Sequence, residues 1–327
     1  MLGLRAVLAT VLALGALGAP LPAGAQTPAT VPRVGVIVHG GVYDVLIDGL
    51  RQGLRELGLE EGKHLALDVR DTKGDLKAVE AAARDLERGK VDLIYTVAAS
   101  VTLATKRATA QAPIVFFVGT DPVAAGLVQS LAKPGGRLTG VHGLARDLTA
   151  KRLEILKGIM PGLRRVVTFY DPGNATATEN ARLGREAARR VGVQLVERHV
   201  RSVDELRRSV QALKPGEVDA YFYTPDAMVA SRADLIVDAA RGKRLPTMFH
   251  EDSLVDKGAL ASYGSSFREI GRISAKHVQR ILTGTHPMDL PVENYDKIQL
   301  ALNLRTARAL GLAIPASIRS RADKVIE

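Results

Sequence analysis

Short apolar runs alternate along most of the chain with longer segments in which apolar residues recur every three or four positions. Residues 34–38 read VGVIV, and an apolar run of this length is typical of a strand buried on both faces of a parallel sheet. Residues 45–57 place leucine, isoleucine and valine on one helical face, and Gly58, directly after them, is a common helix end. The pattern therefore predicts a strand followed by a helix.

This strand–helix unit recurs in two series. The first series has strands at 34–38, 64–69, 91–96 and 113–118, with helices at 45–57, 75–89 and 100–110. The second has strands at 165–170, 193–200, 218–224 and 245–249, with helices at 176–191, from 202 onward, and at 227–241. Because parallel strands are joined by right-handed crossovers, we expect an α/β protein of two Rossmann-like lobes, each a parallel sheet wrapped by helices.

The C-terminal part adds elements to lobes that are already complete. Strands are predicted at 259–263 and 297–302, and helices at 267–283 and 306–310. These segments must join one lobe or the other, so we expect the chain to cross between the lobes more than once and to form a multi-crossing hinge. The bounds that follow are 33–144 plus 253–285 for the N-terminal lobe, and 145–252 plus 286–320 for the C-terminal lobe.

The first 25 residues have the pattern of a secretory signal peptide. A single charge, Arg5, precedes an apolar run at 6–19, which as a helix rises only about 21 Å against a bilayer core of about 30 Å. Ala23-Gly24-Ala25 places small residues at −3 and −1 of a cleavage point. We therefore expect cleavage after Ala25 and a periplasmic mature chain, with a retained N-terminal anchor as the alternative.

Composition and charge narrow the class of partner. The formal net charge is +10, but the arginines of the predicted helices are interleaved with Asp and Glu, which is typical of solvated helix faces. The chain has no Trp, seven Tyr and six Phe, too few rings for a base-stacking surface, so no nucleic-acid partner is expected. The absence of Cys excludes disulfides, thiolate metal sites, Cys nucleophiles and a lipid-modified Cys.

The sequence carries no recognised catalytic pattern. It has no G-x-S-x-G, no H-E-x-x-H, no P-loop and no dinucleotide G-x-G-x-x-G. His250-Glu251-Asp252 is the one cluster of metal-ligating types, and three adjacent side chains cannot all point at one ion. We therefore expect a binding protein rather than an enzyme, with no cofactor and no metal.

Candidate binding residues follow from the predicted sheets, because ligands of open parallel sheets bind beyond the carboxyl ends of the strands. Two facing lobes would bring those loops to the walls of one cleft. The candidates are His39, Gly40, Gly41, Tyr43, Thr96, Ala98, Ala99, Ser100, Thr120, Asp121, Asp171, Asn174, Thr224, Asp226, His250, Glu251 and Tyr263.

These residue types suit a zwitterionic solute. Ser100, Asp121 and Asp226 lie beside predicted helix starts, where free backbone N–H groups favour an anion. The carboxylates of Asp121, Asp171, Asp226 and Glu251 could pair with an ammonium group. An Asp before a helix is also the usual N-cap, and the rings of Tyr43 and Tyr263 suit core packing as well as ligand contact.

Several strings make the sequence similar to a known family. Residues 120–128 read TDPVAAGLV, 133–136 read KPGG, 258–261 read GALA, and 303–307 read NLRTA. The chain resembles the ABC transporter substrate-binding family that includes tryptophan/tyrosine-type binding proteins. The resemblance implies a type I periplasmic-binding-protein fold with three hinge crossings and an amino-acid-type solute clamped between the lobes. The segments at 39–44, 225–227 and 250–251 depart from the family's usual residues, which leaves the solute's identity open.

The sequence is compatible with three functions. The first is a periplasmic solute-binding protein that delivers a small polar or zwitterionic solute to an ABC importer, whose permease and ATPase are separate chains. The second is a sensor that presents the solute to a membrane receptor, and the third is an exported enzyme. A monomer is expected for the first.

Overall fold

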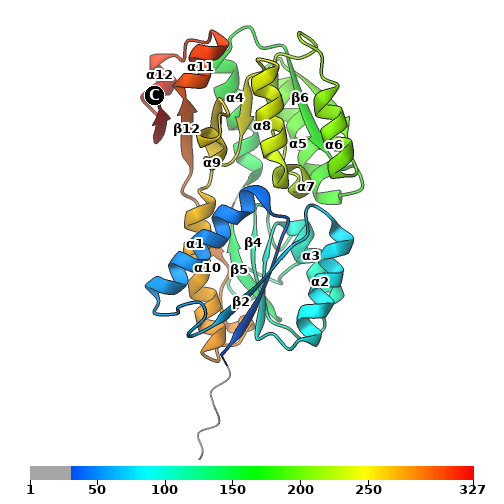
Figure 1. The fold of residues 1–327 in the computed structure, drawn as a ribbon, viewed down its shortest axis with the longest axis vertical. Helices are drawn as coiled ribbons and strands as arrows, with labels where there is room; N and C mark the ends of the chain where they lie inside the picture. Colours follow the sequence, from blue (N-terminus) through cyan, green and yellow to red (C-terminus); the bar gives the residue numbers. More distant parts are fainter. Residues whose placement is uncertain (1–30, 144) are drawn as a thin grey trace, which may run out of the picture. The chain divides into compact units, whose positions relative to one another are not determined.

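The computed structural model describes residues 31–143 and 145–327, and these build two α/β lobes (Figure 1). The expected signal peptide at 1–25 lies outside the described residues. Residues Val31–Glu327 form one compact unit. No helix within the described part of the chain is long and apolar enough to span a membrane.

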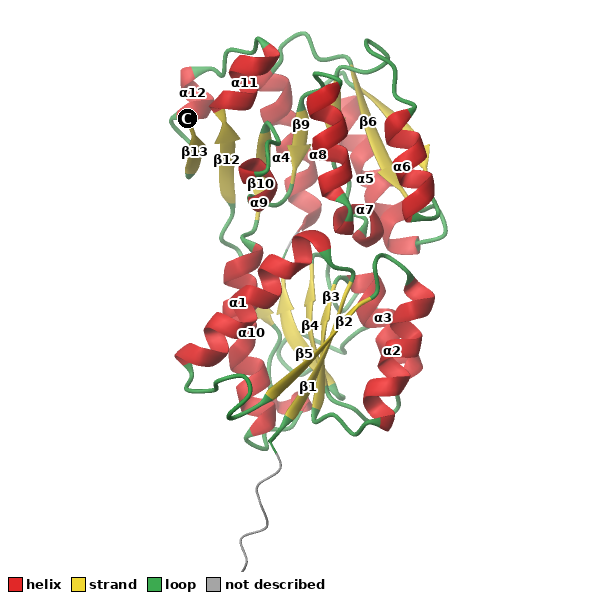
Figure 2. Ribbon diagram, viewed as in Figure 1, coloured by secondary structure: helices red, strands yellow, loops and turns green. Residues whose placement is uncertain are grey.

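The first lobe is built on a six-stranded parallel sheet in the order β11-β5-β4-β3-β1-β2. Helices cover both of its faces (Figure 2), with α1 and α10 packed on one and α2 and α3 on the other. The strands are β1 (Arg33–Val38), β2 (Ala66–Asp71), β3 (Leu93–Val97), β4 (Ile114–Val118), β5 (Leu138–His142) and β11 (Glu293–Asn294). The helices are η1 (Gly41–Tyr43), α1 (Asp44–Glu56), α2 (Leu76–Arg88), α3 (Ala99–Ala108), α10 (Phe267–Leu282) and η2 (Pro287–Asp289).

The second lobe is built on a seven-stranded sheet in the order β13-β12-β10-β9-β8-β6-β7, with only the β10–β12 pair antiparallel. Its strands are β6 (Arg165–Tyr170), β7 (Gln194–His199), β8 (Ala220–Phe222), β9 (Thr247–Phe249), β10 (Ala261–Gly264), β12 (Gln299–Asn303) and β13 (Lys324–Ile326). Its helices are α4 (Ala145–Ile159), α5 (Ala175–Arg190), α6 (Val203–Gln211), α7 (Ala227–Ser231), α8 (Ala233–Gly242), α9 (Ser253–Asp256), α11 (Leu304–Leu310) and α12 (Ala316–Arg319).

The expected fold class is confirmed, and the local sequence signals explain where its elements begin. The central strands β3 and β4 are buried along their whole length, as their apolar runs predict. Asp75 caps α2 by accepting the N–H of Lys77, and Ser202 caps α6 by accepting that of Glu205. The carboxylate of Glu205 in turn accepts the N–H of Arg201, one residue before the cap.

The chain passes between the two sheets three times: from β5 to α4, from β10 to α10, and from β11 to β12. Two of these passages differ from the lobe bounds expected from the sequence. Within 253–285, strand β10 pairs with β9 and β12 and so belongs to the second sheet, while only α10 packs on the first lobe. Within 286–320, strand β11 pairs with β5 of the first sheet.

Each of these segments belongs to the lobe in which it finds a helix to pack against or a strand to pair with. Helix α10 lies against α1 so closely that a Cβ at Gly49 would sit 1.9 Å from the carbonyl oxygen of Arg268. The short strands on either side of α10 instead join different sheets, β10 between β9 and β12 and β11 at the edge beside β5, because their backbone groups need hydrogen-bond partners. Helix packing and strand pairing therefore divide this part of the chain between the lobes.

Candidate functional site

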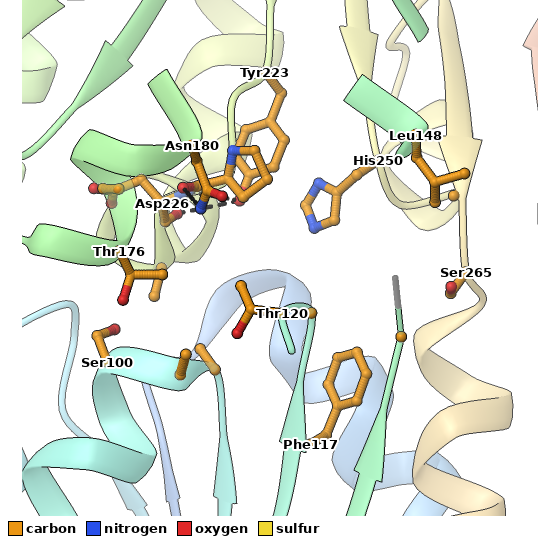
Figure 3. A pocket seen from close by; sticks show the side chains of 18 of the residues that line it. Ser100, Phe117, Thr120, Leu148, Thr176, Asn180, Tyr223, Asp226, His250 and Ser265 are labelled. Carbon is orange, nitrogen blue, oxygen red and sulfur yellow. Dashed lines mark hydrogen bonds between the residues drawn. The ribbon is translucent and has the colours of Figure 1, made fainter. Parts of the chain in front are cut away.

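A cavity lies where the carboxyl ends of the two sheets face each other (Figure 3). Ser100, Thr120 and Phe117 reach it from the first lobe, and Thr176, Asp226 and His250 from the second. The full lining is Tyr43, Ala98, Ala99, Ser100, Phe117, Gly119, Thr120, Gly143, Leu148, Arg152, Asn174, Thr176, Ala177, Asn180, Tyr223, Pro225, Asp226, Ala227, His250, Gly264, Ser265 and Phe267. Most of these side chains are apolar or aromatic, as in small-molecule sites.

Eight of the candidates from the sequence lie on this lining. They are Tyr43, Ala98, Ala99, Ser100, Thr120, Asn174, Asp226 and His250. The rule that ligands bind beyond the carboxyl ends of parallel strands places them there.

Asp226 is the buried acid of the cavity, with a side chain only 3% exposed. It caps α7: one carboxylate oxygen accepts the N–H of Val229 at 2.9 Å, and the other accepts the N–H of Asp171 at 3.0 Å. The hydroxyl of Tyr223 bonds to its backbone N–H and carbonyl. Burial raises the pKa of Asp226 to about 6, and the two backbone N–H donors oppose that rise. No ion pair joins this carboxylate to another described side chain.

The wall beside Asp226 is fixed by hydrogen bonds. The Asn180 amide donates to the carbonyl of Pro225 at 2.9 Å, and the hydroxyls of Thr168 and Thr224 lie 2.7 Å apart beneath it. Asn174 caps α5 through the N–H groups of Thr176 and Ala177. The loops that carry the polar lining are therefore held before any solute enters.

Five rings form the apolar side of the cavity and come from both lobes. Tyr43 and Phe267 stack with centroids 5.6 Å apart, and Phe117 meets Phe267 edge-on at 5.7 Å. Across from them, Tyr223 stacks on His250 at 4.2 Å, and His250 contacts Phe267 at 5.3 Å. Burial and the neighbouring Arg152 guanidinium lower the pKa of His250 well below its ordinary value, so its imidazole is neutral.

Arg152, on α4, is the cation of the lining and is 1% exposed. One of its terminal nitrogens donates to the hydroxyl of Thr149 at 3.0 Å, while its Nε has no partner among the described residues. Burial lowers the pKa of Arg152 to about 10, which still leaves the guanidinium charged at neutral pH. The hydroxyls of Tyr221 and Tyr223 are its polar neighbours.

The start of α3 forms part of the opposite wall. Ala98 precedes this helix with φ 81° and ψ 145°, and no side chain caps the helix. Ala98, Ala99 and Ser100 all line the cavity, so the uncapped end of the helix, with its free N–H groups, lies at the wall. The nearby hydroxyl of Thr120 is buried without a partner among the described residues.

Nine candidates from the sequence lie off the lining: His39, Gly40, Gly41, Thr96, Asp121, Asp171, Thr224, Glu251 and Tyr263. Several have internal partners that explain their position. Thr96 bonds to Thr102 at 3.0 Å, and Asp121 and Asp171 accept backbone N–H groups two residues further on. Thr224 pairs with Thr168 as described above, and Tyr263 packs against the second lobe's core.

Two of the nine are buried titratable groups. The His39 ring lies 2.6 Å from the Thr72 hydroxyl, and burial lowers the pKa of His39 to about 4. The Glu251 carboxylate accepts the N–H of Ser253 at 2.9 Å, and burial raises the pKa of Glu251 to about 8. Gly41 instead lies at the contact between the lobes, where it meets the backbone of Ser231, and Gly40 lies against the Asp71 carboxylate within the first lobe.

Sequence reasoning missed fourteen lining residues. Arg152 and Asn180 are among those that lie inside helices, and Ser265 and Phe267 lie at a hinge passage, so no strand end marks these four. The fourteen are Phe117, Gly119, Gly143, Leu148, Arg152, Thr176, Ala177, Asn180, Tyr223, Pro225, Ala227, Gly264, Ser265 and Phe267. A direct signal existed for Phe117 and Tyr223, each next to the last residue of a predicted strand, and for Gly119, Pro225 and Gly264, each directly after one. Among the described residues, no group of three or more His, Cys, Asp or Glu could hold a metal ion.

Comparison with known proteins identifies relatives of this chain. The model of the family described as "ABC transporter substrate binding protein" matches residues 33–326. A tyrosine-binding protein of Clostridioides difficile is 26% identical over 265 residues, covering 81% of this chain and 76% of the relative.

Two similar solved structures differ in whether a ligand is bound. The ABC domain of a Streptococcus pneumonia protein in complex with L-Trp superposes with a TM-score of 0.79. The ligand-free, open structure of a substrate-binding protein with adhesive properties from Clostridium difficile gives 0.59. Each is 25% identical, and each alignment covers 90% of this chain and 99% of the other.

Proposed function

The chain belongs to the ABC transporter substrate-binding protein family, and from this premise we propose that it captures a small amino-acid-like zwitterion between its lobes and delivers it to an ABC importer. The observation that carries the proposal is the cavity between the lobes. It holds one buried carboxylate, Asp226, without a cation beside it, and a wall of aromatic rings. An ammonium group would pair with that carboxylate, and an apolar side chain would lie on the rings.

The relatives support an amino acid as the solute class. One is described as tyrosine-binding and another was solved with L-Trp. The cavity of this chain keeps the features that such solutes require, namely a buried acid, a free helix start and several rings. The second part of the proposal, delivery to a permease with its ATPase by a periplasmic monomer, rests on family membership and on the expected signal peptide.

A thermal-shift screen tests the proposal directly. The panel holds the twenty L-amino acids, small mono- and dicarboxylates, dipeptides and sugars. A cognate solute at a hundred times its Kd is expected to stabilise the protein by about 2.7 kcal/mol, which raises the melting temperature measurably. Stabilisation by sugars alone, or by no member of the panel, would contradict an amino-acid-like solute.

Asp226→Asn examines the role of the acid. The amide keeps an oxygen that can accept the N–H of Val229 but carries no charge. Loss of a charge-assisted bond to ammonium is expected to weaken binding of the solute by at least about tenfold in calorimetry. Equal affinity for the wild type and the variant would leave Asp226 as a helix cap only.

For export, the expected cleavage after Ala25 is tested by mass spectrometry of the secreted chain, which is expected to find Gln26 at its N-terminus.

A further inference from the structure

The guanidinium of Arg152 is a buried cation with no anion beside it. It is 1% exposed, and no ion pair joins it to any side chain that the structure describes. The polar groups around it are neutral: the Thr149 hydroxyl on its own helix, the phenols of Tyr221 and Tyr223 on and after β8, and the imidazole of His250 after β9. Its Nε has no acceptor among the residues that the structure describes.

A second arginine of the chain shows how a structural guanidinium is accommodated. Arg137, which is partly buried in the first lobe, donates to the carbonyls of Ala112, Lys106 and Thr109 at 2.7 to 2.9 Å. Those three acceptors compensate the donors of a group that serves the fold. Arg152 has one hydroxyl acceptor and an open cavity instead. Burying a charge without a counter-ion costs several kcal/mol, so its retention at the cavity wall requires another explanation.

The explanation lies in the second buried charge of the same cavity. Asp226 also lacks a counter-ion, and the two groups are not paired with each other although both line the cavity. We propose that Arg152 binds the carboxylate of the solute, so that the cavity accepts solutes that carry a carboxylate together with an ammonium group. This inference rests on the proposed function and extends it, because it assigns the anion-binding residue and sets which solutes are rejected.

Capture of the solute would then compensate both charges at once. The carboxylate would supply the acceptor that the Arg152 guanidinium lacks, and Asp226 would receive the ammonium group. The start of α3 is the competing site for the carboxylate, since its free N–H groups also line the cavity. The test therefore has to separate these two positions.

The experiment pairs a change in the protein with a change in the probe. L-tyrosine, L-tryptophan and L-leucine are each titrated beside their carboxamides, which keep the ammonium and side chain but lose the negative charge. In the wild type, the acid that binds is expected to bind at least about thirtyfold more tightly than its amide. In Arg152→Gln, the Kd of the acid is expected to rise about thirtyfold and that of the amide to change less than about threefold.

Stability measurements distinguish recognition from a structural role. Arg152→Gln removes an unpaired buried charge, so the unfolding midpoint of the solute-free protein is expected to stay equal or rise. Arg137→Gln is the matched control: it is expected to lower the midpoint, because three carbonyls lose their donors, and to leave the Kd of the acid unchanged. Arg152→Lys keeps the charge on a single nitrogen and is expected to give an intermediate ratio of acid to amide affinity.

Each outcome has a clear meaning. An unchanged acid-to-amide ratio in Arg152→Gln overturns the inference and assigns the carboxylate to the start of α3, while the proposed function stands. If Arg152→Gln does not fold, an unchanged ratio in Arg152→Lys overturns it equally. A wild type that binds neither these acids nor any other carboxylate of the screening panel contradicts the proposed function itself.

Discussion

At the scale of single residues, the burial of Asp226 makes the free energy of unfolding depend on pH. Its carboxyl group has a pKa of about 6 in the fold, against about 3.9 in an unfolded chain. The folded state therefore holds this proton more tightly between pH 4 and 6. Stability from this group is fully present below about pH 4 and is lost as the pH rises through about 6. At neutral pH the solute-free protein thus carries a destabilising charge that an ammonium group can relieve.

Unfolding in urea across pH 4.5 to 7.5, for the wild type and Asp226→Asn, measures this effect. Other titrating groups, Glu251 among them, contribute equally to both proteins and cancel in the difference. The free energy of unfolding of the wild type minus that of the variant is expected to fall by about 2 kcal/mol over this pH range. A difference that stays constant with pH would mean that Asp226 has an ordinary pKa.

At the scale of elements, the junction between β3 and α3 combines an unfavourable backbone with a position in the cavity wall. Ala98 has φ 81° and ψ 145°, a conformation that is costly for any residue with a Cβ. The next residue, Ala99, is already in the helix. Strain of this kind persists where the surrounding structure holds it, which here is the bonded strand before it and the helix after it.

The same substitution at the two neighbouring positions tests this strain. Ala98→Gly is expected to raise the free energy of unfolding by about 1 kcal/mol, because glycine adopts a positive φ without the Cβ clash. Ala99→Gly is expected to lower it by about 0.5 kcal/mol, as glycine does in a helix. Denaturant titration compares both with the wild type. A loss of stability in Ala98→Gly equal to that in Ala99→Gly would contradict the argument.

The elements also decide how far sequence could predict this protein. Long, regular patterns such as those of α1 and β4 were predicted to within a few residues, because burial on a defined face leaves a period in the sequence. Strand β5 and helix α4 were not predicted. β5 is five residues long and includes Gly140, and α4 ends in contact with α12 besides its neighbours α5, β9 and β10, so its apolar positions follow no single face.

The site was predictable only where it consists of strand ends. His250 directly follows a predicted strand, and Asp226 and Ser100 come within four residues of the end of one, so the geometry of parallel sheets places them at the cavity. Arg152 lies inside α4, the helix with which the chain enters the second lobe after β5, and it lines the cavity. Its role depends on what surrounds it in three dimensions, and no local pattern records that a charged residue will be buried without a partner.

At the scale of the whole molecule, the two lobes meet on the side away from the hinge passages through η1 and α7. Gly41 of η1 has φ 68°, and a Cβ built on it would lie 2.1 Å from the carbonyl oxygen of Ser231 at the end of α7. Backbone-to-backbone contact this close exists only while the lobes are together.

Gly41→Ala is therefore expected to hold the lobes apart while leaving each of them folded. A side chain at this position cannot coexist with the Ser231 backbone, so closure becomes less favourable and the solute binds at least about tenfold more weakly. Gly62→Ala is the matched control: Gly62 also has a positive φ, 86°, but nothing lies within 4 Å of a Cβ built there. Both variants bear the left-handed strain, and only Gly41→Ala bears the clash between lobes.

Small-angle scattering separates an effect on closure from an effect on folding. In the wild type and in Gly62→Ala, the radius of gyration is expected to fall when saturating solute is added, as hinge closure requires. In Gly41→Ala it is expected to stay larger at the same solute saturation, with circular dichroism unchanged because both sheets remain intact. If Gly41→Ala closes and binds like Gly62→Ala, the contact between η1 and α7 does not control closure, and the hinge alone would have to account for how the lobes come together.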